Sequence, residues 1–178
     1  MEVRRLVPAD AAKYRALRLR GLAEHPDAFT SSHDEDVQIP LGATKRRLAP
    51  DGPDAVWGAF VDGELAGVLG LTVERRVKNR HKAHVFGMYV PAEFGRRGIG
   101  RALVAHVIAT ARATPHVEQL TLTVTRGNGR ARGLYATAGF VTFGVEPRAI
   151  RVGDRYFDKE HMVLFLAPVD GELPPDSR

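Results

Sequence analysis

The 178-residue chain contains no cysteine, which excludes disulfide bonds, thiolate metal sites and cysteine nucleophiles. Aromatic residues make up only 7% of the sequence, so there is no evident platform on which nucleic-acid bases could stack. No apolar run reaches membrane-spanning length without a charge, and the first residues lack the apolar core of a signal peptide. We therefore expect a cytoplasmic protein that does not enter a membrane.

Positive charge is in excess. The formal net charge is +5 at pH 7, which favours anionic partners. The arginines are scattered from Arg4 to Arg178 rather than massed in one run, so a phosphate-bearing small molecule explains the charge as well as nucleic acid does. The length, with 44% hydrophobic and 26% charged residues, predicts one globular domain over residues 1–167. Residues 168–178 are expected to form a disordered tail.

Hydrophobic periodicity predicts a mixture of strands and helices. The predicted strands are 2–7, 55–61, 64–73, 83–90, 119–125, 140–144 and 155–166. The predicted helices are 8–24, 98–113 and one between an N-cap at Asn128 and a C-cap at Gly139. Strand 83–90, helix 98–113 and strand 119–125 are expected to form a right-handed βαβ unit, while the hairpin turning at Asp62-Gly63 is antiparallel. The fold class is therefore α/β, with a mixed, mostly antiparallel central sheet and flanking helices.

Three regions have weaker patterns. In the first helix, the small apolar residues Ala12, Ala16, Leu19 and Ala23 recur at helical spacing. A second helix is expected to start after the loop at 25–36 and to run past Lys45 and Arg47 despite Pro40. The last two strands are expected to be joined by a long connection that contains Gly153-Asp154.

The most informative stretch runs from Phe86 to Leu103, where an apolar strand leads through a glycine- and arginine-rich loop directly into a helix. At such a junction the first helical N–H groups have no partner inside the helix, and the helix dipole adds partial positive charge. Glycine lets the backbone approach an anion closely, and arginine adds full charge. The residues concerned are Gly95, Gly98, Gly100, Arg96, Arg97 and Arg101. The loop therefore predicts a phosphorylated ligand.

Two common phosphate-binding motifs do not fit this loop. A dinucleotide site needs Gly-x-Gly-x-x-Gly, but the residue three positions after Gly100 is Leu103. A P-loop needs Gly-Lys followed by Ser or Thr, and the chain has no such tripeptide. Dinucleotide binding and nucleotide hydrolysis are therefore disfavoured.

Two separated motifs point elsewhere: Gly95-Arg-Arg-Gly-Ile-Gly100, and Asn128-Gly-Arg-Ala-Arg-Gly-Leu-Tyr-Ala-Thr-Ala-Gly-Phe140. Together they resemble the GCN5-related N-acetyltransferase (GNAT) family over about residues 2 to 166. That family has Gln or Arg, two residues, Gly, one residue, then Gly or Ala in the first motif. The second motif, Asn-x-x-Ala-x-x-Leu-Tyr-x-x-x-Gly-Phe, is matched at every fixed position. Gly95 departs from the first motif, and Arg96 is a candidate to compensate.

The resemblance implies acetyl-CoA as co-substrate and assigns a set of contacts. The diphosphate would lie on the N–H groups of about Arg96 to Arg101, and the pantetheine arm would run beside Met88 to Val90, where the strand separates from strand 119–125. Asn128 would also contact the arm, and Tyr135 would lie near the thioester sulfur, placed to protonate the leaving thiolate or to hydrogen-bond to it. The implied cofactor-binding residues are Met88, Tyr89, Val90, Gly95, Arg96, Arg97, Gly98, Ile99, Gly100, Arg101, Asn128 and Tyr135.

Each of these residues also has a purely structural interpretation. The Arg96-Arg97 pair alone would indicate an exposed basic turn, Tyr135 a core aromatic residue, and Asn128 a helix cap. The acidic cluster at Asp34, Glu35 and Asp36 favours helix capping over attraction of a cationic amine.

The general base is open. Relatives often carry Glu where this chain has Thr123, which cannot accept a proton at neutral pH. His84 is the first candidate, since it lies on the strand that leads to Met88, is expected on the same face, and has a suitable pKa. Glu74 and Glu35 are the others.

The resulting hypothesis is direct attack of a primary amine on acetyl-CoA within a ternary complex. No acyl-enzyme is expected because the chain has no cysteine and no serine in a nucleophile elbow, and the chemistry needs no metal. The chain would act as a monomer or a homodimer. Two other functions stay open: a non-catalytic acyl-CoA-binding sensor and a basic RNA-associated protein.

Overall fold

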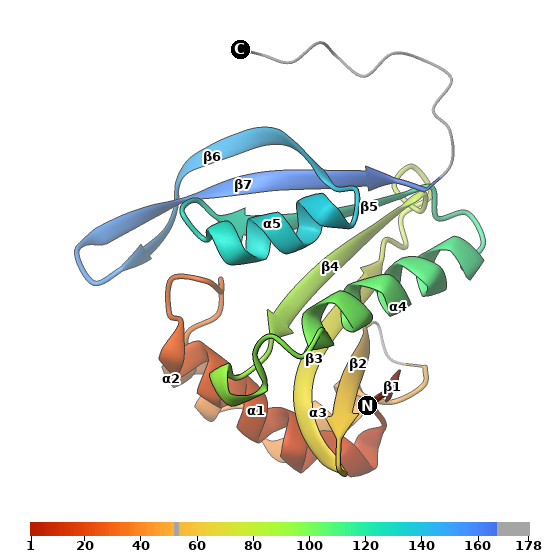
Figure 1. The fold of residues 1–178 in the computed structure, drawn as a ribbon, viewed down its shortest axis with the longest axis vertical. Helices are drawn as coiled ribbons and strands as arrows, with labels where there is room; N and C mark the ends of the chain where they lie inside the picture. The colour runs from red at the N-terminus through yellow and green to blue at the C-terminus, as the bar shows by residue number, and fades with distance from the viewer. Residues whose placement is uncertain (52–53, 167–178) are drawn as a thin grey trace.

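The computed structural model describes residues 1–51 and 54–166 (Figure 1). Within them, one sheet has the strand order β1-β2-β3-β4-β5-β7-β6. The strands are β1 Glu2–Arg5, β2 Asp54–Val61, β3 Glu64–Val73, β4 Lys82–Tyr89, β5 Gln119–Thr125, β6 Val141–Val152 and β7 Arg155–Phe165. The helices are η1 Pro8–Asp10, α1 Ala11–Glu24, α2 His33–Val37, α3 Leu41–Arg47, η2 Ala92–Phe94, α4 Ile99–Ala113 and α5 Gly129–Thr137. The tail predicted at 168–178 lies outside the described residues.

The sheet is mixed and mostly antiparallel, as predicted. β4 and β5 are parallel and are connected through α4, whereas the other neighbouring strands pair antiparallel. A parallel pair needs a crossover connection, and α4 supplies it. Among the described residues, no helix is both long and apolar enough to cross a bilayer.

β4 and β5 separate after a short paired segment. Only Lys82 to His84 pair with Gln119 to Thr121, after which β4 stays with β3 and β5 with β7 (Figure 1). Beyond the separation, β4 has a β-bulge against β3, and Gly87 in it has a φ of +65°. A positive φ suits glycine because it has no Cβ. The edge of β4 that faces β5 is therefore free for another partner.

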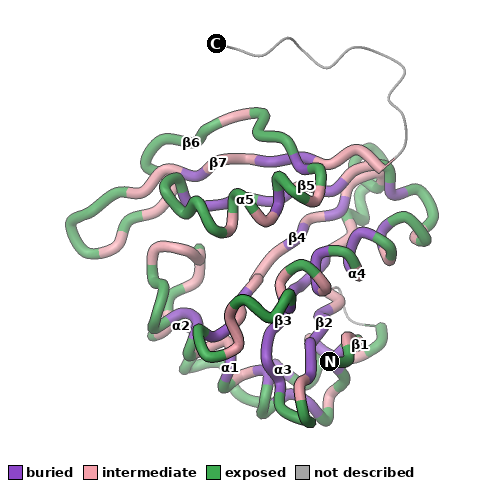
Figure 2. Tube along the Cα trace, in the orientation of Figure 1, coloured by how far each residue is buried: buried purple, intermediate pink, exposed green. Residues whose placement is uncertain are grey.

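Two hydrophobic cores cover the two faces of the sheet. One lies under α4 and α5 and includes Leu103, Val107 and Leu122. The other lies under α1 and α3 and includes Tyr14, Phe60 and Tyr89. Figure 2 shows the buried residues concentrated in the central strands and along one side of α4, while β6 is exposed for most of its length. Each face of the sheet is thus covered by its own helices, and the sheet is open between β4 and β5 where these strands separate.

The region between α1 and β2 differs from the prediction. The expected single helix is two short ones, because Pro40 has extended backbone (φ −62°, ψ 146°) and begins α3 rather than continuing α2. The expected stripe on α1 was also wrong: Ala12, Ala16 and Ala23 are exposed, and the buried positions include Tyr14 and Leu17. The spacing of the alanines predicted a helix correctly, but it did not identify the buried face of that helix, which carries the larger side chains.

The C-terminal pair of strands was also predicted incorrectly. β6 extends to Val152, so the expected long connection is instead strand, and Gly153-Asp154 is a two-residue hairpin turn. The pairing slips between Glu146 and Ile150, where Arg148 has a φ of +52°. The prediction found the start of β6, where Val141, Phe143 and Val145 alternate with other residues, but ended at Gly144, before Glu146-Pro-Arg-Ala149 interrupts the alternation.

Candidate active site

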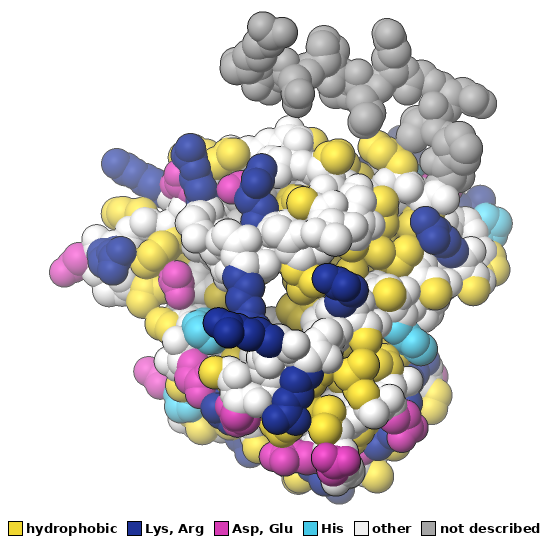
Figure 3. Space-filling model, in the orientation of Figure 1, with side chains coloured by type: hydrophobic (Ala, Val, Ile, Leu, Met, Phe, Trp, Pro, Cys, Tyr) yellow, Lys and Arg dark blue, Asp and Glu magenta, His cyan; other side chains and the backbone are white. Residues whose placement is uncertain are grey.

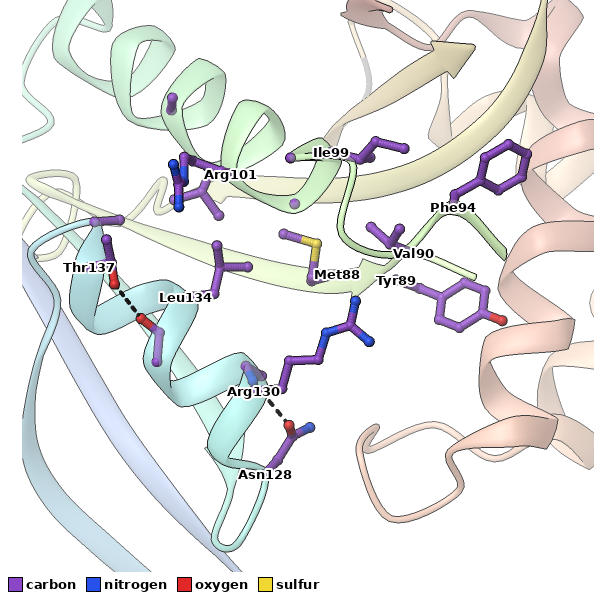
Figure 4. A pocket seen from close by; sticks show the side chains of 18 of the residues that line it. Met88, Tyr89, Val90, Phe94, Ile99, Arg101, Asn128, Arg130, Leu134 and Thr137 are labelled. Carbon is purple, nitrogen blue, oxygen red and sulfur yellow. Dashed lines mark hydrogen bonds between the residues drawn. The ribbon is translucent and has the colours of Figure 1, made fainter. Parts of the chain in front are cut away.

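A cavity of about 970 Å³ opens between the separated strands, at the upper end of the usual range for ligand sites. We call it the large cavity. Its walls come from the end of β4, the loop that leads into α4, the exposed side of α5 and the loop after α1 (Figure 4). In Figure 3 a hollow near the middle of the face is bordered by basic side chains, drawn in dark blue.

The start of α4 forms a cradle for an anion. Gly98 is the N-cap residue with a φ of +75°, and no side chain caps the helix there. The first N–H groups of α4 are therefore free to bind a ligand. A Cβ on Gly100 would lie 3.1 Å from Leu134 Cδ2, so a larger residue at this position would have to displace Leu134 slightly, and glycine leaves the most room between α4 and α5. This observation fits a diphosphate on the backbone.

Arginines supply the charge around this cradle. Arg96 and Arg101 line the large cavity as expected. Arg97 does not line it; its guanidinium lies 5.6 Å from the centre of the Phe94 ring. Arg130, which the sequence reasoning missed, extends from α5 into the cavity (Figure 4). Its Nη2 lies 3.2 Å from the position that a Cβ on Gly95 would occupy, so a cation stands beside the residue that departs from the family motif.

The end of β4 forms the wall along which an extended ligand arm could lie. Met88, Tyr89 and Val90 all line the large cavity. The Tyr89 side chain is turned toward α1, where its hydroxyl donates to Glu24 at 2.6 Å and its ring packs against Gly21. Burial and the Glu24 carboxylate raise the pKa of Tyr89 well above its ordinary value of 10. Tyr89 therefore contributes backbone rather than a reactive group.

The loop after α1 closes one side of the large cavity with His25, Ala28 and Phe29. A buried lysine holds this loop: Lys159 Nζ donates to the carbonyl of Ala28 at 3.0 Å and to Thr125 Oγ1 at 2.7 Å. Burial lowers the pKa of Lys159. This wall depends on a contact between residues more than a hundred positions apart, which no local pattern could predict.

Asn128 caps the N-terminus of α5, as predicted from the sequence. Its side chain accepts from the Ala131 N–H at 3.1 Å at the start of α5. It also lines the large cavity, so the two roles assigned to Asn128 are compatible.

Tyr135 lies in the core under α5, with its ring 5.9 Å from Phe140 in an edge-on contact. It is not among the residues that line the large cavity. Burial raises its pKa well above 10, so the phenol keeps its proton at neutral pH. The Tyr135 hydroxyl makes no hydrogen bond within residues 1–51 and 54–166. Among these residues, however, every fully buried side-chain nitrogen or oxygen has a hydrogen-bond partner, so this hydroxyl is not fully buried. It therefore keeps at least a small exposed area, although Tyr135 as a whole is only 6% exposed.

His84 does not share a face with Met88, so that prediction was wrong. Ala83, Val85 and Met88 pack with the α4 core, whereas Phe86 packs with the α1 core. The bulge at Gly87 breaks the alternation, which places His84 on the α1 face. There its Nδ1 lies 3.2 Å from Thr121 Oγ1. Burial lowers the pKa of His84 below its ordinary 6.5, so the imidazole is neutral at pH 7.

The other candidate bases are less suitable. Glu35 accepts from the backbone N–H and hydroxyl of Ser32 at 3.0 and 2.8 Å, and these bonds lower its pKa. The acidic cluster therefore caps α2, as favoured from the sequence, and Asp36 forms an ion pair with Arg18. Glu74 is exposed beyond β3, and Thr123 is exposed on β5.

The comparison with family models decides the assignment. The acetyltransferase (GNAT) family model matches residues 20–140, which include the cradle, α4 and α5. The chain belongs to the GNAT acetyltransferase family.

Solved GNAT-like structures and one curated relative agree with this assignment. An acetyltransferase of the family from Streptococcus pneumoniae superposes with a TM-score of 0.83 at 25% identity, covering 93% of this chain and 99% of that one. The protein yncA from Salmonella typhimurium, solved with its cofactor acetyl-CoA, has a TM-score of 0.76 at 21% identity, covering 100% and 99%. The L-amino acid N-acetyltransferase AaaT of Escherichia coli (strain K12) is 31% identical over 105 residues. That match spans 58% of this chain and 64% of the relative.

Proposed function

We propose that this GNAT protein transfers an acetyl group from acetyl-CoA to a primary amine by direct attack in a ternary complex. The observation that carries the proposal is the open start of α4, which faces a cavity of about 970 Å³ between the separated strands. Acetyl-CoA, when bound, supplies an acetyl group activated as a thioester.

The residues that would hold acetyl-CoA come from three elements. Backbone N–H groups from Gly98 to Arg101 would bind the diphosphate, with Arg96 and Arg130 adding charge. Met88 to Val90 would hydrogen-bond the pantetheine amides as an added strand.

The chemistry would be divided between the two faces of the sheet. His84, neutral at pH 7, would take the proton from the attacking amine, directly or through water. Tyr135, protonated at that pH, would donate a hydrogen bond or proton to the departing thiolate. Backbone N–H groups at the β4 bulge would polarise the carbonyl, and the two cavity walls would supply proximity.

The acceptor is proposed to be a small amine. The curated relative acts on L-amino acids according to its name, which supports a free small molecule over a protein terminus.

The test is to incubate the protein with acetyl-CoA and a panel of amines while free thiol is measured, with CoA binding followed by calorimetry. Thiol release that requires an amine supports the proposal. Tight CoA binding with no release for any amine would instead indicate a sensor. Salt-sensitive RNA binding without CoA affinity would indicate the RNA-associated alternative.

A further inference from the structure

A second cavity, of about 380 Å³, lies on the opposite face of the sheet from α4. We call it the small cavity. It is enclosed by α1, α2, α3 and the start of β2. Its charged lining residues are Arg15, Arg18, Arg46, Arg47, Asp36 and Asp54, and its apolar ones include Tyr14, Leu19 and Ile39.

One arginine of the small cavity, Arg18, reaches the bulge of β4. Arg18 Nη1 is 3.8 Å from the position that a Cβ on Gly87 would occupy, and no other non-neighbouring atom of the described residues comes within 4 Å of that position. The Arg47 guanidinium lies 5.4 Å from the centre of the Phe86 ring. Two arginines thus stand over consecutive residues of β4, immediately before Met88, which lines the large cavity. Through Gly87, the bulge of β4 links Arg18 of the small cavity with Met88 of the large cavity.

Both arginines are fixed by one edge and leave donors free. Arg18 donates through Nε to Asp36 and through Nη2 to Ser31 Oγ at 3.1 Å. Arg47 donates through Nε to Asp54 Oδ2 at 2.8 Å. Within residues 1–51 and 54–166, Arg18 Nη1 and both Nη atoms of Arg47 make no hydrogen bond. The Arg18 side chain is only 16% exposed, so its free donors serve a confined space rather than bulk water.

The remaining charges make this space cationic. Asp36 and Asp54 compensate two of the four arginines. Arg15 donates to the carbonyl of Val37, and Arg46 forms no ion pair within the described residues. The two positive charges left without an ion pair in this part of the chain are therefore those of Arg15 and Arg46, whereas Arg18 and Arg47 contribute free N–H donors rather than net charge. The two net positive charges of the lining disfavour polyamines and favour an anionic group.

We propose that the small cavity binds the carboxylate of the acceptor, so that the acceptor is an amino acid held by Arg18 and Arg47; this rests on the proposed function. A guanidinium with free donors recognises a carboxylate well. Arg18 lies beside the bulge next to Met88, so the amine and the carboxylate must be only a few bonds apart, as in an α-amino acid. The wall of Tyr14, Leu19 and Ile39 favours an apolar side chain.

The test compares three acceptors of nearly equal shape: L-leucine, L-leucinamide and 3-methylbutylamine. The amide removes the negative charge, and the amine removes the whole carboxyl group. We expect kcat/KM to fall at least 10-fold for both analogues. In Arg18→Gln the kcat/KM values for the three acceptors should agree within about 3-fold. Arg75 is an exposed arginine outside both cavities, so Arg75→Gln should keep the preference for L-leucine.

A binding measurement makes the result independent of turnover. In calorimetry, L-leucine should bind the protein–CoA complex at least 10-fold more tightly than L-leucinamide, and Arg18→Lys should retain part of this difference. Equal binding of the two ligands would overturn the inference. Thiol release that is equal for all three amines would also overturn it while leaving the acetyltransferase proposal intact. Absence of release with every amine would instead overturn the proposed function.

Discussion

Replacing Arg130 by glutamine should weaken CoA binding through the loss of one phosphate contact. The Arg130 Nη2 atom lies 3.2 Å from the Cβ position at Gly95, over the loop that leads into α4. A hydrogen bond to a charged group contributes about 1.5 to 3 kcal/mol. Because Arg130 is exposed, solvent screening reduces this to about 1 to 2 kcal/mol, or a factor of roughly 5 to 30 in Kd.

The assay is calorimetric titration with CoA and, in parallel, with pantetheine, which has no diphosphate. Arg130→Gln should weaken the binding of CoA and leave that of pantetheine unchanged. Arg126→Gln is the matched control, since Arg126 is 65% exposed, pairs with Asp158 and does not line the large cavity. Equal losses for both ligands, or no loss for CoA, would refute the assignment of Arg130 to the diphosphate.

Three other changes test the chemistry and the fold. Tyr135→Phe should lower kcat about 100-fold with CoA affinity nearly unchanged; an unchanged kcat in steady-state assays removes Tyr135 from the reaction. Since burial lowers the pKa of His84, kcat/KM should fall only as the pH drops below 6.5 and the base becomes protonated, and His84→Gln should abolish that acid limb. Asp10 accepts from Arg4 at 2.8 Å twice and from the Val7 N–H at 2.9 Å, so Asp10→Asn should lower the free energy of unfolding by about 1 to 3 kcal/mol. The Arg4 bonds lower the Asp10 pKa, so urea titrations should show this loss at neutral pH and find it vanishing as the pH falls through that pKa.

The sequence predicted the parts of the fold that have strong local signals. The β2–β3 hairpin, α4 and the cap at Asn128 each carry a periodic or capping pattern within one segment. The start of β6 has an alternating pattern and was predicted, but its continuation past Gly144 was missed because Glu146-Pro-Arg-Ala149 interrupts the alternation. The face of α1 was missed because its core residues are interleaved with alanines.

The candidate site was predicted where motifs are contiguous. Gly98 and Gly100 belong to a contiguous motif, so the sequence predicted the anion-binding start of α4. Arg130 lies on a different helix, α5, and its side chain reaches the loop before α4 only in the folded structure. His84 was assigned to the wrong face because one inserted residue at the bulge reverses an alternating pattern. A sequence pattern does not show contacts between distant segments, such as that of Arg130, or a one-residue bulge such as that in β4.

The two cavities are lined by different elements of the fold, which matters for changing the specificity of the protein. The small cavity is lined by α1, α2, α3 and the start of β2, and the large one by the end of β4, the loop into α4, α4, α5 and the loop after α1. On the proposed assignment of the acceptor, substitutions at Leu19 or Ile39 should change the preferred acceptor side chain while leaving the affinity for CoA unchanged. Acceptor preference could then be redesigned on helices that do not line the proposed acetyl-CoA cavity.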